Sequence, residues 1–153
     1  MVTTSALQIA RRFVGVKEAA GAASNPAVLA MLRLDAKWVE DDQTAWCSAF
    51  VNYVCWLLEL PRSRSLAARS WLTVAQSVPL AEARPGFDVV VLTRGAGTQP
   101  PASVIAAPGH VGFFVGFEAG GAVLILGGNQ GDAVNVAPFP RARVLGVRRL
   151  QGA

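Results

Sequence analysis

The chain has 153 residues, 52% of them hydrophobic and 16% charged, and a net charge of +4 at neutral pH. This length suits a single domain, expected over residues 1–153 with a core from about 7 to 149, and the composition excludes a disordered chain. The arginines are scattered and form no stripe with exposed aromatic residues. Binding to nucleic acid is therefore not expected. Most of the arginines are expected to be solvated surface charge, although the net charge would favour an anionic partner such as a cell-wall polymer.

Helical patterns fill the first half of the chain. Thr3 or Thr4 can cap a first helix, whose apolar positions approximate one face and which stops near Gly15. Ser24-Asn25-Pro26 is a start signal for a second helix over residues 27–34, because a capping residue precedes a proline at the first helical position. These two signals predict a helical N-terminal segment.

A third helix coincides with the longest apolar stretch, Ala45 to Leu58. Thr44 or Asp42 can cap it, and Pro61 ends it. The stretch has about 14 residues, whereas a bilayer span requires roughly 20, so we expect a buried helix and no membrane span. A short fourth helix is predicted over residues 65–71.

Strand patterns fill the second half of the chain. The expected strands are residues 87–92, 111–115, 122–126, 133–136 and 144–150. Ala119-Gly120-Gly121 is typical of a hairpin turn, and residues 93–108 are rich in Gly, Pro, Ala and Ser, which predicts an exposed loop. Helices followed by antiparallel strands indicate an α+β fold.

Cys47 follows a polar segment at the start of the third helix, and it is one of two cysteines. The reactive form of cysteine is the thiolate, which the positive end of a helix dipole favours. Cys55 lies eight residues later on the same helix, which separates the two Cα atoms by about 12 Å. A disulfide requires less than about 7 Å, so the two cysteines are not expected to pair.

His110 is the only histidine of the chain, and it opens the strand expected at 111–115. A cysteine at a helix start and a distant histidine on a strand are what a cysteine nucleophile requires, with a third polar group to orient the imidazole. Asn129, after the next strand, is the candidate for that group. The backbone N–H of Cys47 and the side chain of Gln43 are candidate oxyanion donors. One Cys-His pair does not supply the four ligands of a structural zinc site.

Each of these residues also has a structural interpretation. A buried helical cysteine is usually an inert packing residue, which is the interpretation we favour for Cys55. A lone histidine on a strand is often a hydrogen-bonded structural group, and Asn129 could simply form a turn. Trp46, next to Cys47, is expected to line a groove, whereas the other tryptophans are expected in the core. The co-occurrence of cysteine, histidine and asparagine in this order favours a catalytic function.

Several segments resemble the NlpC-type and CHAP-type cysteine peptidases, and most closely the small CHAP-like proteins of bacteria and phages. They are Asp42–Asn52, which contains Trp46-Cys47-Ser48-Ala49-Phe50-Val51-Asn52, and then Ser65–Leu72, Gly86–Val91, Gly109–Phe113 and Leu126–Gln130. The resemblance covers roughly Leu7 to Arg149. It implies a single catalytic domain with a papain-like α+β fold, in which N-terminal helices pack on a small antiparallel β-sheet.

The resemblance also implies an activity and a site. Family members cleave amide bonds of peptidoglycan, within the stem peptide or between muramic acid and L-alanine, without a metal or organic cofactor. By resemblance, Cys47 is the nucleophile, His110 the base and Asn129 the orienting residue. The expected oxyanion and substrate-binding residues are Asp42, Gln43, Trp46, Ser48 and Gln130. CHAP members often carry a glutamate near the third position, whereas this chain has Gly127 there, and Asp88 is expected to be structural.

Three hypotheses follow. The first is a monomeric peptidoglycan hydrolase, either an endopeptidase or an N-acetylmuramoyl-L-alanine amidase. Residues Met1–Gln8 show no secretory signal, which fits a phage lysin or an injected antibacterial effector that acts on the cell wall or in the periplasm after release or injection. An effector would require an immunity protein as partner. The second hypothesis is an inert interaction module on the same fold, and the third is a thiol hydrolase or deamidase that acts on a protein.

Overall fold

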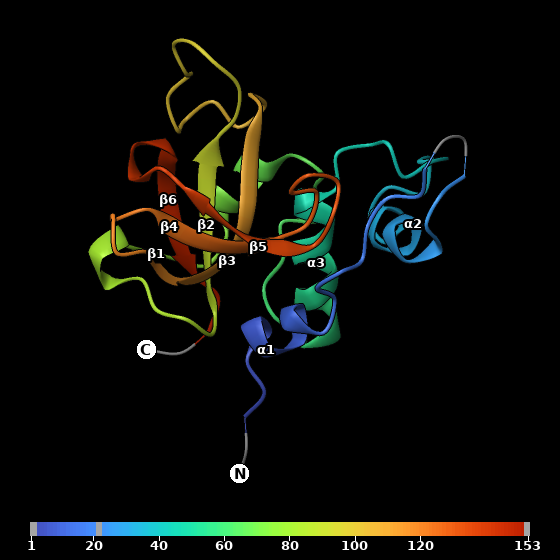
Figure 1. The fold of residues 1–153 in the computed structure, drawn as a ribbon, viewed down its shortest axis with the longest axis horizontal. Helices are drawn as coiled ribbons and strands as arrows, with labels where there is room; N and C mark the ends of the chain where they lie inside the picture. The colour runs from blue at the N-terminus through green and yellow to red at the C-terminus, as the bar shows by residue number, and fades with distance from the viewer. Residues whose placement is uncertain (1–2, 21–22, 152–153) are drawn as a thin grey trace.

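The computed structural model describes residues 3–20 and 23–151 (Figure 1). Over these residues the helices are α1 (Ala6–Arg11), α2 (Pro26–Arg33), α3 (Cys47–Leu57) and the 3₁₀ helices η1 (Ala68–Thr73), η2 (Leu80–Glu82) and η3 (Arg141–Arg143). The strands are β1 (Gln76–Val78), β2 (Asp88–Thr93), β3 (Gly109–Phe117), β4 (Val123–Gly127), β5 (Asn135–Phe139) and β6 (Val144–Arg149). They form one antiparallel sheet in the order β1-β6-β2-β3-β4-β5, so the predicted α+β class is confirmed.

The start of α1 differs from the prediction. Ser5 caps it in a capping box: the Ser5 hydroxyl accepts from the N–H of Gln8, and the Gln8 side chain accepts from the N–H of Ser5. This reciprocal pair satisfies two backbone donors, which a cap at Thr3 or Thr4 would leave open. The helix then ends at Arg11, and the chain continues through turns to Gly15.

The predicted start of α2 is confirmed. The Asn25 side chain accepts from the N–H of Ala27 at 2.8 Å, and Pro26 occupies the first helical position. By contrast, α3 begins at Cys47 with no side-chain cap, because the carboxylate of Asp42 already accepts from other backbone N–H groups. None of the helices in the described part of the chain is long and apolar enough to cross a bilayer.

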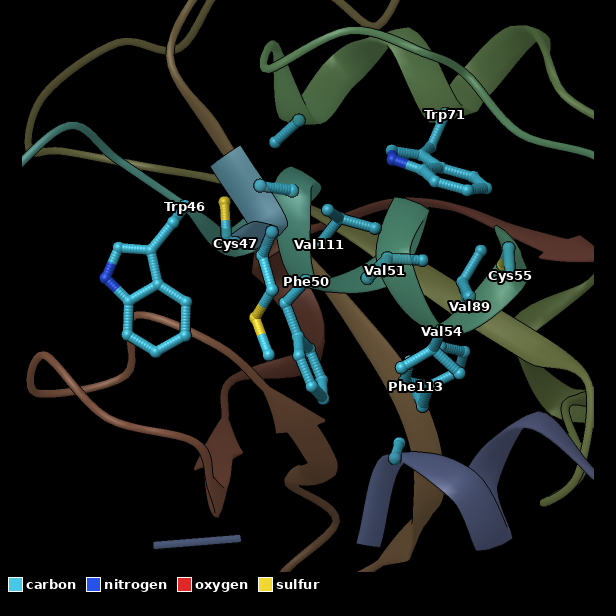
Figure 2. Packing of buried hydrophobic residues seen from close by; sticks show 14 of the residues in the cluster. Trp46, Cys47, Phe50, Val51, Val54, Cys55, Trp71, Val89, Val111 and Phe113 are labelled. Carbon is cyan, nitrogen blue, oxygen red and sulfur yellow. The ribbon is translucent and has the colours of Figure 1, made fainter. Parts of the chain in front are cut away.

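The core lies between α3 and the sheet. Phe50 and Val54 of α3 are fully buried against Val111 and Phe113 of β3, and the rings of Phe50 and Phe113 meet edge to face at 6.1 Å (Figure 2). Figure 1 shows α1, α2 and α3 gathered on one side of the molecule and the sheet on the other. This packing holds the first residue of α3 against the sheet.

A second apolar cluster covers the other side of the sheet. It consists of Val78, Val90, Leu92, Phe114, Val123, Ile125 and Val147. The central strands are therefore buried on both sides, which explains the near-continuous apolar runs in the sequence. The hairpin predicted at Ala119-Gly120-Gly121 joins β3 to β4 and is confirmed by a hydrogen bond from the N–H of Glu118 to the carbonyl of Ala122. The short edge strand β1 was not predicted, because two of its three residues are exposed and polar.

Candidate active site

Cys47 is the first residue of α3, and it lies at the end of the sheet where β3 begins. Its side chain is 2% exposed and lines a hollow with residues that include Ala67, Pro108 and Gly109. The backbone N–H of Val111 lies within hydrogen-bonding reach of the thiol. The sulfur is therefore held next to the peptide group that joins His110 to Val111.

The protonation of Cys47 is set by opposing effects. Burial raises the pKa of the thiol above its ordinary value of 9.0, while the N–H of Val111, the charge of Arg94 and the N–H groups at the start of α3 lower it. Burial dominates, so the resting thiol is protonated and requires a base. Cys55 is also free, and burial raises its pKa to about 12, although Arg62 lowers it. Cys55 is buried in the core, as the packing interpretation expected.

His110 is held by Gln130, which follows β4. The ring nitrogen Nε2 lies 2.9 Å from Oε1 of Gln130. The amide nitrogen of Gln130 donates to the carbonyls of Ile125 and Asn135 and to Oδ1 of Asn135, at 2.8 to 3.2 Å. Since Nε2 of Gln130 donates to acceptors only, its Oε1 accepts the proton on Nε2 of His110. The neutral ring therefore carries its proton on Nε2, and Nδ1 is left as the basic atom.

Two further contacts fix this arrangement. Nδ2 of Asn135 donates to the backbone carbonyl of Gln130 at 2.8 Å, which holds the segment after β4 in place. The His110 ring stacks on Phe139 of β5, with centroids 5.3 Å apart and an angle of 27° between the planes. Both the acceptor and the ring are thus held from neighbouring strands.

The charge state of His110 matches that of the thiol. Burial lowers the pKa of the imidazole below its ordinary value of 6.5; the hydrogen bond to Gln130 raises it, and the charges of Arg94 and Arg143 lower it further. The resting pair is a neutral thiol and a neutral imidazole. Among the described residues, no hydrogen bond joins Cys47 to the His110 ring. The thiol lies beside the N–H of Val111, the residue after His110, and the charge of Arg94 acts on both groups. Catalytic hydrogen bonds often tighten only when substrate is bound.

The structure gives the two amides of the Gly127-Gly128-Asn129-Gln130 segment different places from those expected. Asn129, predicted to orient His110, adopts a left-handed backbone with φ of 57° and lines the hollow beside the ring. Gln130, predicted to bind substrate, makes the hydrogen bond to the imidazole. The turn at Asn129 directs the next side chain inward.

Asp42 and Gln43 were expected near the oxyanion or the substrate, and they support the loop before α3 instead. The buried Asp42 carboxylate accepts from the N–H groups of Ala19 and Asn25 at 2.8 and 2.7 Å, and from Nε2 of Gln43 at 3.1 Å. Burial would raise the pKa of Asp42, but these hydrogen bonds outweigh it and lower the pKa. Asp88 is also structural, in an ion pair with Arg149 at 2.8 Å.

Trp46 and Ser48 were expected to contact substrate, and both lie in the interior. Trp46 is 0% exposed, and its Nε1–H donates to Glu18 at 2.8 Å. The Ser48 hydroxyl donates to the carbonyl of Ser65 at 2.6 Å and accepts from Nε1 of Trp71. These two side chains flank Cys47 in the sequence and anchor the start of α3 to Glu18 on one hand and to Ser65 and Trp71 on the other.

Sequence reasoning missed two arginines. Arg94, directly after β2, lines both the hollow of Cys47 and the hollow of His110. Arg143, in η3, donates through Nε and Nη2 to the carbonyl of Thr93 at 3.2 and 2.7 Å. No local signal marks them, because their proximity depends on the pairing of β2 with β3 and β6. Within the described ranges, no group of three or more His, Cys, Asp and Glu residues could hold a metal ion.

No protein-family description and no curated protein matches the sequence. Among solved structures, that of NlpC1 from Trichomonas vaginalis is similar, with a TM-score of 0.57 and 17% sequence identity. The match covers 95% of this chain and 42% of that one, so this chain spans less than half of its length. At this identity the likeness shows the fold alone, and it confirms the predicted papain-like α+β architecture.

Proposed function

We propose that the protein is a cysteine-dependent amide hydrolase that cleaves peptidoglycan. The observation that carries this proposal is the paired placement of Cys47 and His110. The thiol lies at a helix start beside the peptide that follows His110, and Gln130 holds the imidazole with Nδ1 as the basic atom. A nucleophile, a base and a neutral orienting group are the parts that thiol catalysis requires.

The first half of the reaction forms a thioester. Nδ1 of His110 takes the thiol proton while Sγ of Cys47 attacks the amide carbonyl carbon, which forms the C–S bond. The carbonyl oxygen becomes an oxyanion, which the N–H groups at the start of α3 stabilise. The oxyanion then collapses, the C–N bond breaks, and His110 gives its proton to the leaving amine.

The second half regenerates the enzyme. Water attacks the thioester carbonyl while Nδ1 of His110 takes a proton from it. The C–S bond breaks, the acid is released, and His110 returns the proton to Sγ of Cys47. Gln130 remains a neutral acceptor for Nε2–H throughout, so it keeps the ring in place in both charge states.

The substrate class rests on the resemblance of Trp46–Asn52 and Gly127–Gln130 to wall-cleaving cysteine peptidases, and on the net charge of +4, which favours an anionic polymer. The cleaved bond is within the stem peptide or between muramic acid and L-alanine. We propose that the protein acts as a monomer, as a phage lysin or as an injected effector, and that an effector has an immunity protein as its partner.

The test is mass spectrometry of purified peptidoglycan after incubation with the wild type, Cys47→Ala and the matched control Cys55→Ala. New muropeptides are expected with the wild type and Cys55→Ala only, and their masses identify the bond. Free stem peptides would indicate the amidase reaction, and shortened stems would indicate the endopeptidase reaction. Unchanged peptidoglycan of several chemotypes, or equal products from Cys47→Ala, would overturn the proposal.

A further inference from the structure

The hollow beside His110 is lined by positive charge that the proposed roles of Cys47, His110 and Gln130 do not explain. It has a volume of about 400 Å³, within the range of small-molecule sites, and it opens between the segment after β2, the segment after β4, β5 and η3. His110, Gln130 and Asn135 contribute polar groups, and Phe139 contributes an aromatic wall. It is separate from the hollow of Cys47, and Arg94 lines both.

Two guanidinium groups reach this hollow. Arg143 is fixed through Nε and Nη2 by the carbonyl of Thr93, and its guanidinium lies over the Phe139 ring at 5.3 Å. Its Nη1 donates to no other described residue, so it is available to a ligand. Arg94 is exposed, and no hydrogen bond or ion pair joins it to another residue in the described ranges.

The described lining of the hollow offers no carboxylate to balance these charges. Among the described residues that line the hollow, none is acidic. By contrast, Arg62 and Arg149 each pair with an acid, Asp35 and Asp88, at 2.9 and 2.8 Å. Two converging arginines without an acid, one of them pre-organised by a carbonyl and an aromatic ring, form a site that matches an anion.

The side of the substrate that reaches this hollow follows from the chemistry. His110 delivers a proton to the leaving amine, so the amine half of the cleaved bond lies on the His110 side, and the acyl half lies on the Cys47 side. The anion that a peptide carries next to an amide nitrogen is the carboxylate of the same amino acid or of its side chain. The hollow is therefore placed to hold that carboxylate.

We propose that Arg94 and Arg143 form a subsite for a free carboxylate on the amine side of the cleaved bond. The substrates preferred are then those in which the amino acid released as the amine carries an unblocked carboxylate. The assignment to the amine side rests on the proposed function, whereas carboxylate binding in the hollow does not.

The probe is N-acetylalanine, in its L and D forms, compared with N-acetylalaninamide. Its acetyl amide represents the scissile bond, and its carboxylate or carboxamide occupies the place in question. Binding is followed through the ring protons of His110 by NMR, because the chain has one histidine and its signal is unambiguous. The Cys47→Ala variant is used, so that no thioester forms.

N-acetylalanine of at least one configuration is expected to bind saturably and to raise the pKa of His110. The charged groups that act on the ring are Arg94 and Arg143, and Gln130 and Phe139 beside it are neutral. A carboxylate between the arginines offsets their charge, whereas the carboxamide does not. Arg94→Gln and Arg143→Gln are each expected to weaken binding about tenfold.

Arg141→Gln is the matched control, since Arg141 lies in the same 3₁₀ helix but contacts Gly121 and Phe117 outside the hollow. Equal binding of the carboxylate and carboxamide probes, or an equal loss in Arg141→Gln, would overturn the subsite. Because Arg94 is exposed, its replacement keeps the fold and retains the test if Arg143→Gln unfolds. Carboxylate binding without wall hydrolysis would uphold the subsite and defeat the proposed function. Wall hydrolysis together with a His110 signal that does not respond to the carboxylate probe would uphold the proposed function and overturn the subsite.

Discussion

Oε1 of Gln130 accepts the Nε2 proton of His110 across 2.9 Å, and this contact decides which nitrogen of the ring can act as a base. The orientation of the Gln130 amide is fixed by its other contacts, because its nitrogen donates to the carbonyls of Ile125 and Asn135 and to Oδ1 of Asn135. A neutral amide holds the imidazole without the extra charge that a carboxylate would add. Burial lowers the pKa of His110 below its ordinary value, and the hydrogen bond to Gln130 raises it by less than burial lowers it.

Gln130→Ala removes the group that orients the base. We expect kcat to fall about 10- to 100-fold with little change in KM, because substrate binding is retained while the ring is no longer held. Steady-state kinetics on soluble muropeptides would measure this, with Asn129→Gly as the comparison, since glycine tolerates the φ of 57° at that position. A larger loss of kcat in Asn129→Gly would return the orienting role to Asn129.

The acid limb of the pH–rate profile is expected below 6.5, the ordinary value for histidine. Burial, Arg94 and Arg143 all lower the pKa of His110, so the ring is still mostly neutral at pH 6.5. The reaction rate is therefore expected to fall only as the pH drops through the pKa of His110 in the folded protein. The unfolded chain takes up this proton at higher pH than the folded chain, so stability also declines as pH falls below 6.5. An NMR titration of His110 with a midpoint above 6.5 would contradict both expectations.

The two thiols are expected to differ in reactivity. Cys47 lines a hollow, whereas Cys55 is fully buried and burial raises its pKa to about 12. Iodoacetamide should alkylate the native wild type once, at Cys47, and faster as pH rises, because the thiolate is the nucleophile. Peptide mapping by mass spectrometry identifies the site, and denaturant should expose the second thiol. Equal labelling of Cys55 in the native protein would show that the core opens more readily than the packing indicates.

Arg69→Met should destabilise the protein. Arg69 is fully buried, and its guanidinium donates to the carbonyls of Pro100, Pro101 and Pro108 at 2.9 to 3.0 Å. Losing the guanidinium removes a donor from each of these carbonyls, although the carbonyl of Pro101 keeps the N–H of Val104, and we expect the free energy of unfolding to fall by about 2–4 kcal/mol. Urea denaturation measures the change.

Arg11→Met is the matched control, because Arg11 is exposed at the end of α1 and a surface substitution there is expected to change stability by less than about 0.5 kcal/mol. Hydrogen exchange at residues 100–108 should rise in Arg69→Met alone. A loss of stability without faster exchange in that loop would mean that Arg69 supports the core rather than the loop.

Most elements of the fold could be predicted because their signals are local. Asn25-Pro26 starts α2 by its own chemistry, and the apolar run of β2 requires burial on both sides. The absence of a side-chain cap at the start of α3 could not be predicted, since the carboxylate of Asp42 accepts from backbone N–H groups of a distant segment. The edge strand β1 exists through its pairing with β6 and has no pattern of its own.

The candidate site shows the same division. Cys47 and His110 could be singled out because each is rare and stands at the start of an element. The choice between Asn129 and Gln130 could not be made, since the left-handed residue between the end of β4 and Gln130 decides which amide turns inward. Arg94 and Arg143 line the same hollow because β2 pairs with β6, two strands that are far apart in the sequence.

The guanidinium of Arg69 fixes the base of the loop between β2 and β3, and the tip of that loop is exposed. Residues Gly95–Thr98 are exposed, with the Gln99 side chain donating to the carbonyl of Gly95 at 3.1 Å, while Pro100, Pro101 and Pro108 are bound to the guanidinium. The number of residues at the tip can therefore change without changing the distance between Arg94 and His110 at the base of the loop. A reporter peptide or an affinity handle spliced between Gly95 and Thr98 would protrude into solvent near the hollow of Cys47, and we expect it to leave that hollow undisturbed.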